Sequence, residues 1–475
     1  MPAWLDRARA PGRRSSAGGP NAILEGPIAP TLLGLSVPMI MAMFLVTAFG
    51  LVDMIYLGRF SREAMAAVSL AFPVTYLLHT FGGALGSATT STCARLIGAG
   101  RGRDVPNLVL HVIALSVGLA LLLIPVGILL LEPALRAPGT EPLVRDLARQ
   151  YGVITFAGGV FSLFAMNASA LFRGEGDTVF PFKVMAIGLV LNIGLDPLFI
   201  FGPGPFPRLG VLGAAVTTVA SFAVVSLVVL RELAVARDRQ VKLVRGAWRW
   251  DPALVRDLGN VAVPAALANL ALPVSVFLIN RMIAPLGTTA VAAFGAGLRL
   301  LSFVFLPTLG LSLSMMIMVG QNHGAGRRDR VRTITLTTLK YALTLLAALA
   351  LPVMLFPRWA MGLLTDDQAV IEAGWRLARW ATVARPMISI VNIAAFWFQA
   401  KGNGPAGMVP NTVLRVVLEP LGVWIGLALG GLAGGWYGFA IGDAVGGVIF
   451  LIILLWRLRV YVQAGRPPVV LQTST

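Results

Sequence analysis

Charged residues are scarce in this sequence: they make up 12% of its 475 residues, whereas soluble domains carry about 25%. Hydrophobic residues make up 57%, and the mean hydropathy is +0.81. A soluble core cannot bury that much apolar surface, so these values exclude a set of soluble domains and predict that lipid is the solvent. Cysteine is nearly absent, and the single Cys93 excludes an intramolecular disulfide framework. It lies in an apolar stretch, where we expect inert packing.

Catalytic signals are also lacking. The chain has only three histidines and no zinc-binding helix motif. The segment Gly174–Asp177 matches the short G-x-G-D pattern of intramembrane aspartyl proteases, but no Tyr-Asp pair precedes it. Its setting between Arg173 and Pro181 is typical of a cytoplasmic loop. The sequence therefore predicts that the protein is not an enzyme.

What the chain has instead is a series of long apolar segments. A membrane-spanning helix needs about 20 apolar residues to cross a hydrocarbon core of about 30 Å. Twelve segments meet this length, which predicts an all-α integral membrane protein. They are residues 30–57, 65–98, 105–132, 144–172, 179–202, 210–235, 254–284, 288–323, 331–357, 370–400, 406–429 and 434–460.

The second half repeats the first at an offset of 226 residues: Gly98–Arg101 returns as Gly324–Arg327, and Gly176–Asp177 returns as Gly402–Asn403. Two similar membrane halves are typical of secondary transporters, whose substrate site lies between them. We expect two pseudo-symmetric lobes of six helices in parallel orientation. The predicted division is a disordered cytoplasmic tail (1–29), an N-lobe (30–236), a cytoplasmic linker (237–253), a C-lobe (254–461) and a C-terminal cytoplasmic tail (462–475).

The net charge of +17 does not indicate nucleic-acid binding, because the basic residues lie between the spans and not in one patch. Their distribution instead indicates which loops face the cytoplasm. Cytoplasmic loops carry the excess of Lys and Arg. The N-terminal segment lacks the apolar run and cleavage site of a signal peptide. We therefore expect an inner (plasma) membrane protein with both termini in the cytoplasm. The basic residues in and beside the central linker are Arg231, Arg237, Arg239, Lys242, Arg245, Arg249 and Arg256.

Acidic residues inside apolar spans are the strongest chemical signal. Asp53 lies near the predicted outer end of the first span, and Asp196 lies on the fifth. Asn192 precedes Asp196 by four residues and shares its helix face, and Pro197 frees a backbone carbonyl there. Carboxylates within a membrane usually mark ion or proton pathways. The group suits either a proton-binding site or a Na⁺ site at Asp53, Asn192 and Asp196, and the alternative is an Asp near a helix end that reaches water.

Neighbouring polar residues leave further alternatives. Thr217 and Thr218 on the sixth span have hydroxyls that either join this pocket or bond to their own helix. In the second half, Arg415 and Glu419 occupy the places of Asn192 and Asp196, and their spacing of four favours an internal ion pair.

Three more charged residues lie within spans of the second half, and two of them, Asp443 and Arg299, are candidates of second rank. Asp443, on the last span, is a candidate for coupling or cation recognition and corresponds roughly to Thr218. Arg299 is expected to neutralise an acidic group or a backbone carbonyl. Arg385 is the remaining basic residue within a span.

At these residues the chain resembles the multidrug and toxic compound extrusion (MATE) family over nearly its whole length. The best fragments are Phe172–Thr178, Leu191–Gly202, Gly295–Ser312 and Val319–Arg332. The resemblance implies a V-shaped bundle of two six-helix lobes that exports mostly cationic organic compounds in exchange for H⁺ or Na⁺. It implies no cofactor other than this coupling ion.

Carried over residue by residue, the resemblance makes Asp53, Asn192 and Asp196 the cation-binding cluster of the N-lobe, with Asn167 and Thr218 as neighbours. One branch of the family has acidic residues on spans 7 and 10, where this chain has amides such as Asn269 and Gln399. The chain therefore looks more like the DinF-like branch.

The substrate side is less defined. Met39 on the first span and Met316 on the eighth offer soft, adaptable surfaces, although packing is the more common role of methionine. Gln399, Glu419, Asp443 and Arg299 are second-rank candidates. We expect small, cationic and amphipathic substrates, a lipid bilayer environment and a monomer. Two rival interpretations are a flippase of lipid-linked saccharides and an exporter of one endogenous metabolite.

Overall fold

The structure is a computed structural model that describes residues 20–136, 141–236 and 238–464, and helices dominate this part of the chain. The helices are α1 (Pro20–Leu24), α2 (Ile28–Phe60), α3 (Arg62–Gly98), α4 (Val105–Leu135), α5 (Pro142–Ala157), α6 (Gly159–Glu175), α7 (Val179–Phe201), α8 (Val211–Val235), α9 (Pro252–Ile283), α10 (Thr288–Gly324), α11 (Arg328–Leu355), α12 (Pro357–Gly362), α13 (Gln368–Ala400), α14 (Gly404–Thr412) and α15 (Glu419–Gln463). A π-helical turn, Val413–Leu418, joins α14 to α15.

The helices reproduce the predicted spans. Within the described part of the chain, ten helical segments are long and apolar enough to cross a membrane, and the bent pair α5 and α6 adds an eleventh crossing. The segment Gly404–Gln463 has 60 residues and counts as one of the ten, but it folds back on itself at Gly430 and Gly431. Gly431 has φ +57°, which an L-residue with a side chain rarely adopts. Two crossings in this segment complete the twelve expected from the sequence.

Glycines allow the two arms of α15 to pack closely. A Cβ on Gly422 would lie 2.2 Å from the carbonyl oxygen of Gly438, and one on Gly426 would lie 2.1 Å from that of Gly434. Small residues let membrane helices approach at backbone distance, where dispersion contacts hold them together. The last two spans are therefore a tight antiparallel hairpin.

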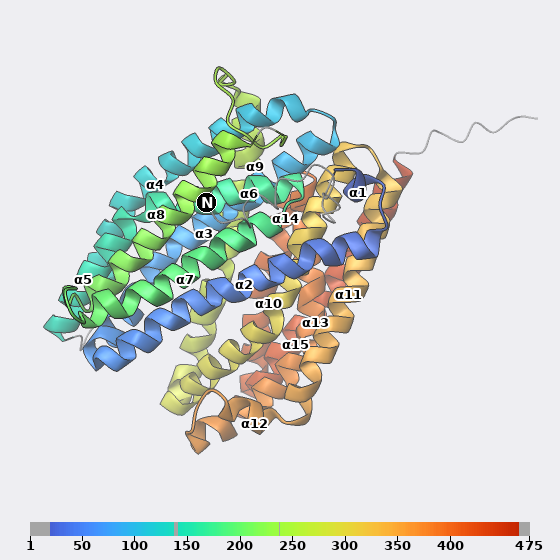
Figure 1. Ribbon diagram of the computed structural model, residues 1–475. Helices are drawn as coiled ribbons and strands as arrows, with labels where there is room; N and C mark the ends of the chain where they lie inside the picture. Colours follow the sequence, from blue (N-terminus) through green and yellow to red (C-terminus); the bar gives the residue numbers. More distant parts are fainter. Residues whose placement is uncertain (1–19, 137–140, 237, 465–475) are drawn as a thin grey trace, which may run out of the picture.

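The helices form two lobes (Figure 1). Helices α2–α8 make the N-lobe, and α9–α15 make the C-lobe. The lobes meet at the end that carries α1 and α14 and diverge toward the end that carries α5 and α12, which gives the expected V shape. We call the first of these the closed end.

The repeated sequence produces a repeated structure at the closed end. Helices α3 and α10 are each followed, two residues after their last residue, by a glycine at φ +71°: Gly100 after α3 and Gly326 after α10. The amide of Arg101 donates to the carbonyl of Leu96, and that of Arg327 donates to the carbonyl of Asn322, both at 2.9 Å. This is a left-handed C-terminal cap, which satisfies helix carbonyls that otherwise lack partners.

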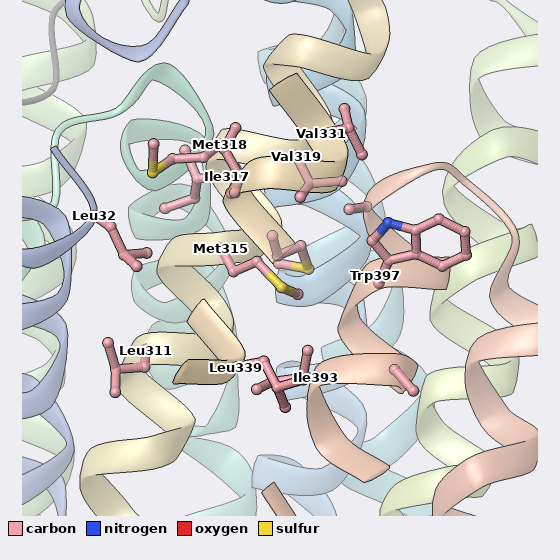
Figure 2. Packing of buried hydrophobic residues seen from close by; sticks show 14 of the residues in the cluster. Leu32, Leu311, Met315, Ile317, Met318, Val319, Val331, Leu339, Ile393 and Trp397 are labelled. Carbon is pink, nitrogen blue, oxygen red and sulfur yellow. The ribbon is translucent and has the colours of Figure 1, made fainter. Parts of the chain in front are cut away.

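The first helix of each half packs against both lobes. Leu32 and Leu35, near the start of α2, belong to a buried cluster formed mainly by α10, α11, α13 and α15, part of which Figure 2 shows. Further along α2, Phe49 stacks on Phe222 of α8, with ring centroids 5.5 Å apart. In the same way, α9 places Leu258 in a cluster of N-lobe helices. Helices α2 and α9 therefore connect the lobes mechanically as well as covalently.

The predicted N-terminal tail is partly ordered. Residues 20–24 form α1 rather than disordered chain, and Ile23 is buried in the cluster of Figure 2. Arg327 donates to the carbonyl of Leu24 at 2.6 Å and pairs with Glu25 at 3.1 Å, so this segment is held against the C-lobe. The prediction for residues 1–19 lies outside the described residues, as does that for 465–475.

The linker from residue 238 to Asp251 has no regular helix and is anchored by one arginine. Arg239 pairs with Asp177 at 2.8 Å, with Glu232 at 3.3 Å and with Glu175 at 3.5 Å. Asp177 also caps α7 by accepting from the amides of Val179 and Phe180. The Gly174–Asp177 motif is thus a helix junction.

Because the lobes pack closely at Gly98, we predict that a larger side chain at this position destabilises the protein. A Cβ on Gly98 would lie 1.9 Å from the carbonyl oxygen of Gln321, so Gly98→Val must push α3 and α10 apart. Overpacking of this kind costs about 1–3 kcal/mol. We expect a lower unfolding temperature in detergent. Gly118→Val on α4 is the matched control, because nothing lies within 4 Å of its Cβ, and equal effects of the two changes would contradict this account.

Candidate functional site: buried carboxylates of the N-lobe

Three adjacent helices bring the predicted cluster together. Helix α2 carries Asp53, α7 carries Asn192 and Asp196, and α8 carries Thr217 and Thr218. These helices approach closely where Gly188 faces α8: a Cβ there would lie 2.8 Å from the Val225 side chain. Asp53 lies in the last third of α2, whose first turns pack on the C-lobe, so the cluster lies away from the closed end.

Hydrogen bonds organise the cluster. Asn192 donates from Nδ2 to Oδ1 of Asp196 at 3.0 Å, and the Thr217 hydroxyl also lies against that oxygen. The Thr218 hydroxyl donates to Oδ2 of Asp53 at 3.3 Å. Thr217 in addition reaches the carbonyls of Gly213 and Ala214 on its own helix at 3.0 Å. Both roles considered for the threonine hydroxyls therefore occur together.

The cluster holds three oxygen atoms that are buried and lack a hydrogen-bond partner in the described part of the chain. They are Oδ1 of Asp53, Oδ2 of Asp196 and Oδ1 of Asn192. Asp196 and Asn192 are fully buried, and Asp53 is 6% exposed. A buried polar atom without a partner costs free energy, so these oxygens could accept a proton or coordinate a cation.

The electrostatics lead to the same conclusion. Asp53 and Asp196 face each other, and among the described residues neither forms an ion pair with a lysine or arginine. Two buried carboxylates side by side cannot both stay charged without compensation. The described residues hold no group of three His, Cys, Asp or Glu suited to a transition metal. Carboxylate, amide and hydroxyl oxygens instead suit a hard ion such as Na⁺, and each carboxylate also suits a proton.

Pro197 acts as the sequence suggested. It lacks the N–H that would bond to the carbonyl of Ile193, and that carbonyl accepts from the Tyr56 hydroxyl of α2 at 3.4 Å. The freed carbonyl therefore ties α2 to α7 beside the cluster. Tyr151 of α5 lies near both carboxylates and is a site residue that the sequence reasoning missed, because nothing in its local pattern places it there.

Asn167 is not part of this arrangement. It is fully buried on α6, where its Oδ1 lies 3.4 Å from the position of a Cβ on Gly86 of α3. Within the described residues, no hydrogen bond connects it to Asp53 or Asp196. The structure thus assembles Asp53, Asn192, Asp196 and Thr218 and leaves Asn167 on another helix interface.

The corresponding place in the C-lobe contains an ion pair, as predicted. Arg415 donates to Oε1 of Glu419 at 2.6 Å, and Ser275 of α9 donates to Oε2 at 2.8 Å. Arg415 lies in the π-helical turn just before Pro420. Since both carboxylate oxygens have partners, Glu419 has no need of a bound cation.

Two further charged residues adjoin this pair. Asp443 is fully buried near Glu419, Arg385 and Arg415, and neither of its carboxylate oxygens has a hydrogen-bond partner among the described residues. Arg385 is 3% exposed. The C-lobe thus sets two carboxylates beside two guanidinium groups, whereas the N-lobe has carboxylates alone.

Other predicted residues lie apart from both clusters. Arg299 is exposed on α10, and among the described residues it forms neither an ion pair nor a side-chain hydrogen bond, so neither the acidic group nor the backbone carbonyl expected as its partner is found. Met316 is fully buried and Met39 is 2% exposed. Met316 belongs to the same buried apolar cluster as Leu32 and Leu35, and Met39 lies among the buried residues of α2, so neither presents a surface to a substrate here. The Gln399 side chain is 6% exposed, and its backbone carbonyl accepts from Ser91 of α3.

Polar contacts between the lobes hold the closed end, and the sequence reasoning missed them. Arg95 of α3 pairs with Asp257 of α9, and Thr92 donates to the same carboxylate at 2.8 Å. Gln321 of α10 donates to the carbonyl of Gly174 on α6 at 3.0 Å. These residues lie near the ends of predicted spans, where polar and charged residues are common. Their partners therefore become evident only when the facing helix is known.

Comparison with known proteins defines the class. The sequence model of the MatE family matches twice, over residues 38–198 and 264–424, one match in each lobe. The chain is 32% identical over 354 residues to a protein of Shewanella oneidensis named FAD transporter, covering 74% of this chain and 78% of that protein. It is 26% identical over 401 residues to the probable multidrug resistance protein NorM of Thermotoga maritima, with coverages of 83% and 82%.

Solved structures agree with this result. A MOP-superfamily transporter from Pyrococcus furiosus superposes with a TM-score of 0.87 at 26% identity, over 93% of this chain and 98% of that one. An outward-facing multidrug resistance MATE transporter gives 0.86 at 26% identity, over 94% and 97%. Because the family model, the relatives and the structural neighbours are those of transporters, the chain is a multi-pass membrane transporter and not an enzyme. The chain belongs to the MatE family of transporters.

Because the C-lobe ion pair is buried, we predict that its loss destabilises the protein more than the loss of an exposed ion pair does. Arg415→Met leaves Glu419 buried without its charged partner, a change that costs about 3–5 kcal/mol. Arg358 and Glu372 form a pair of the same length, 2.6 Å, on the surface. We expect Arg415→Met to lower the unfolding temperature in detergent clearly and Arg358→Met to change it little. Similar shifts for both variants would refute the interpretation of the C-lobe pair as structural.

Proposed function

We propose that this transporter is a secondary active exporter that exchanges substrate for H⁺ or Na⁺ entering through Asp53, Asn192 and Asp196. The observation that carries this proposal is the uncompensated pair of buried carboxylates with three unpartnered oxygens. A bound cation supplies the missing positive charge. The C-lobe carboxylates have arginines beside them and are assigned no coupling role.

Helix α2 connects the proposed cation site to the arrangement of the lobes. Its first turns pack on the C-lobe through Leu32 and Leu35, and its last third carries Asp53 in the N-lobe. A cation that draws Asp53 and Asp196 together acts on the same helix that joins the lobes. Coupling requires only that cation and substrate favour different states.

The proposed orientation places the closed end in the cytoplasm. The described ends of the chain and the linker, with Arg239, Lys242, Arg245 and Arg249, belong to the side that the distribution of basic residues assigns to the interior. In this orientation the lobes diverge toward the outside, and the present conformation faces outward.

The first proposed substrate class is organic cations. Several relatives are named multidrug resistance proteins, among them NorM and MdtK. The relative at 32% identity, which bears the name FAD transporter, supports a second candidate: an exporter of an anionic dinucleotide metabolite. Export of this kind needs the same cation coupling, so the two candidates differ in substrate and not in mechanism.

Efflux from proteoliposomes tests the coupling site. Wild-type protein and Asp53→Asn are compared with ethidium and with FAD, under an inward-directed proton gradient without Na⁺ and then with a Na⁺ gradient. We expect transport by the wild type under one gradient and loss of transport to background in Asp53→Asn, because the amide cannot release a proton or hold Na⁺ as a carboxylate does. Asp104→Asn, an exposed loop carboxylate paired with Arg101, is the matched control.

The outcomes separate the candidates. Transport driven by the proton gradient alone identifies H⁺ as the coupling ion, and transport only with Na⁺ identifies Na⁺. Ethidium efflux supports the drug exporter, and FAD efflux alone supports the metabolite exporter. Normal coupled transport by Asp53→Asn would remove the basis of the proposal.

A further inference from the structure

A small cavity of about 200 Å³ opens beside the closed end, between α13 and the last turns of α15. Trp397, Lys401, Asn403, Arg457 and Tyr461 line it together with apolar side chains, and no acidic residue is among the lining residues. It lies outside the N-lobe cluster and outside the C-lobe ion pairs.

Lys401 is the centre of the cavity's chemistry. Its ammonium nitrogen lies 3.3 Å from the ring centre of Trp397 and 4.9 Å from that of Tyr461. Neither Lys401 nor Arg457 forms an ion pair with a carboxylate of the described chain. Other charged side chains near this end are Arg328, which lies over the Tyr461 ring, and Arg95. The cavity therefore concentrates positive charge that the described residues do not neutralise.

The local structure holds this geometry in place. The Tyr461 hydroxyl lies 2.6 Å from Nδ1 of His323, which fixes the tyrosine ring between α10 and α15. Oδ1 of Asn403 caps α14 by accepting from the amide of Ala406, so the N–H donors of its side chain are not used in that cap. Trp397 is fully buried, whereas Arg457 is exposed at the mouth. The cavity therefore brings two basic side chains, Lys401 and Arg457, next to the aromatic rings of Trp397 and Tyr461.

The surroundings indicate the source of an anion. Trp456, next to Arg457, is 55% exposed, and exposed Trp beside Arg near the end of a span is typical of the level of lipid head groups. Basic pockets between membrane helices at this level bind the phosphates of anionic lipids. A free anion would meet the same donors but would gain nothing from the exposed apolar side chains on α15, such as Val460.

We propose that the cavity formed by Lys401, Arg457, Asn403 and the Trp397–Tyr461 pair binds the phosphate of an anionic phospholipid. The phosphate lies between the two basic side chains, and the acyl chains extend along the exposed face of α15. This site is independent of the transport cycle proposed above and rests on neither its coupling ion nor its substrate.

Thermal unfolding of purified, delipidated protein tests the site. We expect phosphatidylglycerol to raise the unfolding temperature of the wild type by about 5 °C at saturation, and phosphatidylcholine to raise it much less. Arg457→Gln and Lys401→Gln should lose most of the specific shift. Arg459→Gln, two residues along α15 and outside the cavity lining, should keep it. Native mass spectrometry should show that Arg457→Gln retains one phosphatidylglycerol molecule fewer per protein than the wild type does.

Each contrary result has a definite meaning. An equal rise in unfolding temperature with inorganic phosphate would show that the cavity binds a soluble anion and would contradict the assignment to a phospholipid. An equal shift with phosphatidylcholine would overturn recognition of negative charge. Unchanged binding in Arg457→Gln would overturn the location. Arg457 is exposed, so this variant folds even if Lys401→Gln, which loses its contact with Trp397, does not.

A pH series adds a second, independent test. Burial, and then the neighbouring Arg457, lower the pKa of Lys401 to about 7. The ammonium is charged below that pH and becomes neutral as the pH rises through it, so the phosphatidylglycerol shift should shrink from about pH 6 to about pH 8. Lys401→Arg keeps its charge throughout and should make the shift independent of pH. A shift in the wild type that does not change over this range would contradict a role of Lys401.

Discussion

Two carboxylates, Asp53 and Asp196, are buried between α2, α7 and α8 without a basic side chain of the described residues to neutralise them, and the coupling that we propose depends on this constraint. Desolvated negative charge is costly, and a proton or a metal cation bound between the two groups would offset that cost. One of the carboxylates belongs to the helix whose start packs on the opposite lobe. The state of charge and the arrangement of the lobes therefore act on a common element.

The two lobes show how one repeated architecture acquires different chemistry. The proline and the spacing of four residues recur in both halves, but Asn192 and Asp196 in one correspond to Arg415 and Glu419 in the other. Exchanging an amide for a guanidinium turns an acceptor site for cations into an internal ion pair. A site with its own counter-charge gains little from binding an external cation, and for this reason we assign the proposed coupling to the N-lobe carboxylates and not to the C-lobe ion pair.

Much of this organisation follows from the sequence, and the rest does not, for physical reasons. The spans are predictable because apolar length and glycine or proline junctions are local properties, and Asp53, Asn192 and Asp196 stand out because carboxylates are rare in apolar helices. The sequence leaves open whether Thr217 joins the cluster or bonds to its own helix, and it does not place Tyr151 there, because both contacts depend on helix rotation and packing. Met316 shows the opposite error: a soft side chain suits a substrate and a core equally well, and the core holds it. The Arg95–Asp257 contact depends on which span ends meet, and one chain in isolation does not specify that.

The closed end is built from contacts that can be exchanged for water. Arg95 and Asp257 have side chains that are 14% and 38% exposed, and pairs at this level of exposure contribute about 0–1 kcal/mol. Gln321 and Ser91 bond to backbone carbonyls of the facing lobe, and water can replace such partners when the lobes separate. Glycines at the contact, such as Gly98 and Gly324, let the facing backbones approach closely. In the alternation that we propose, opening this end exchanges these contacts for water, and a cation with a modest preference for one state would be sufficient to change which state predominates.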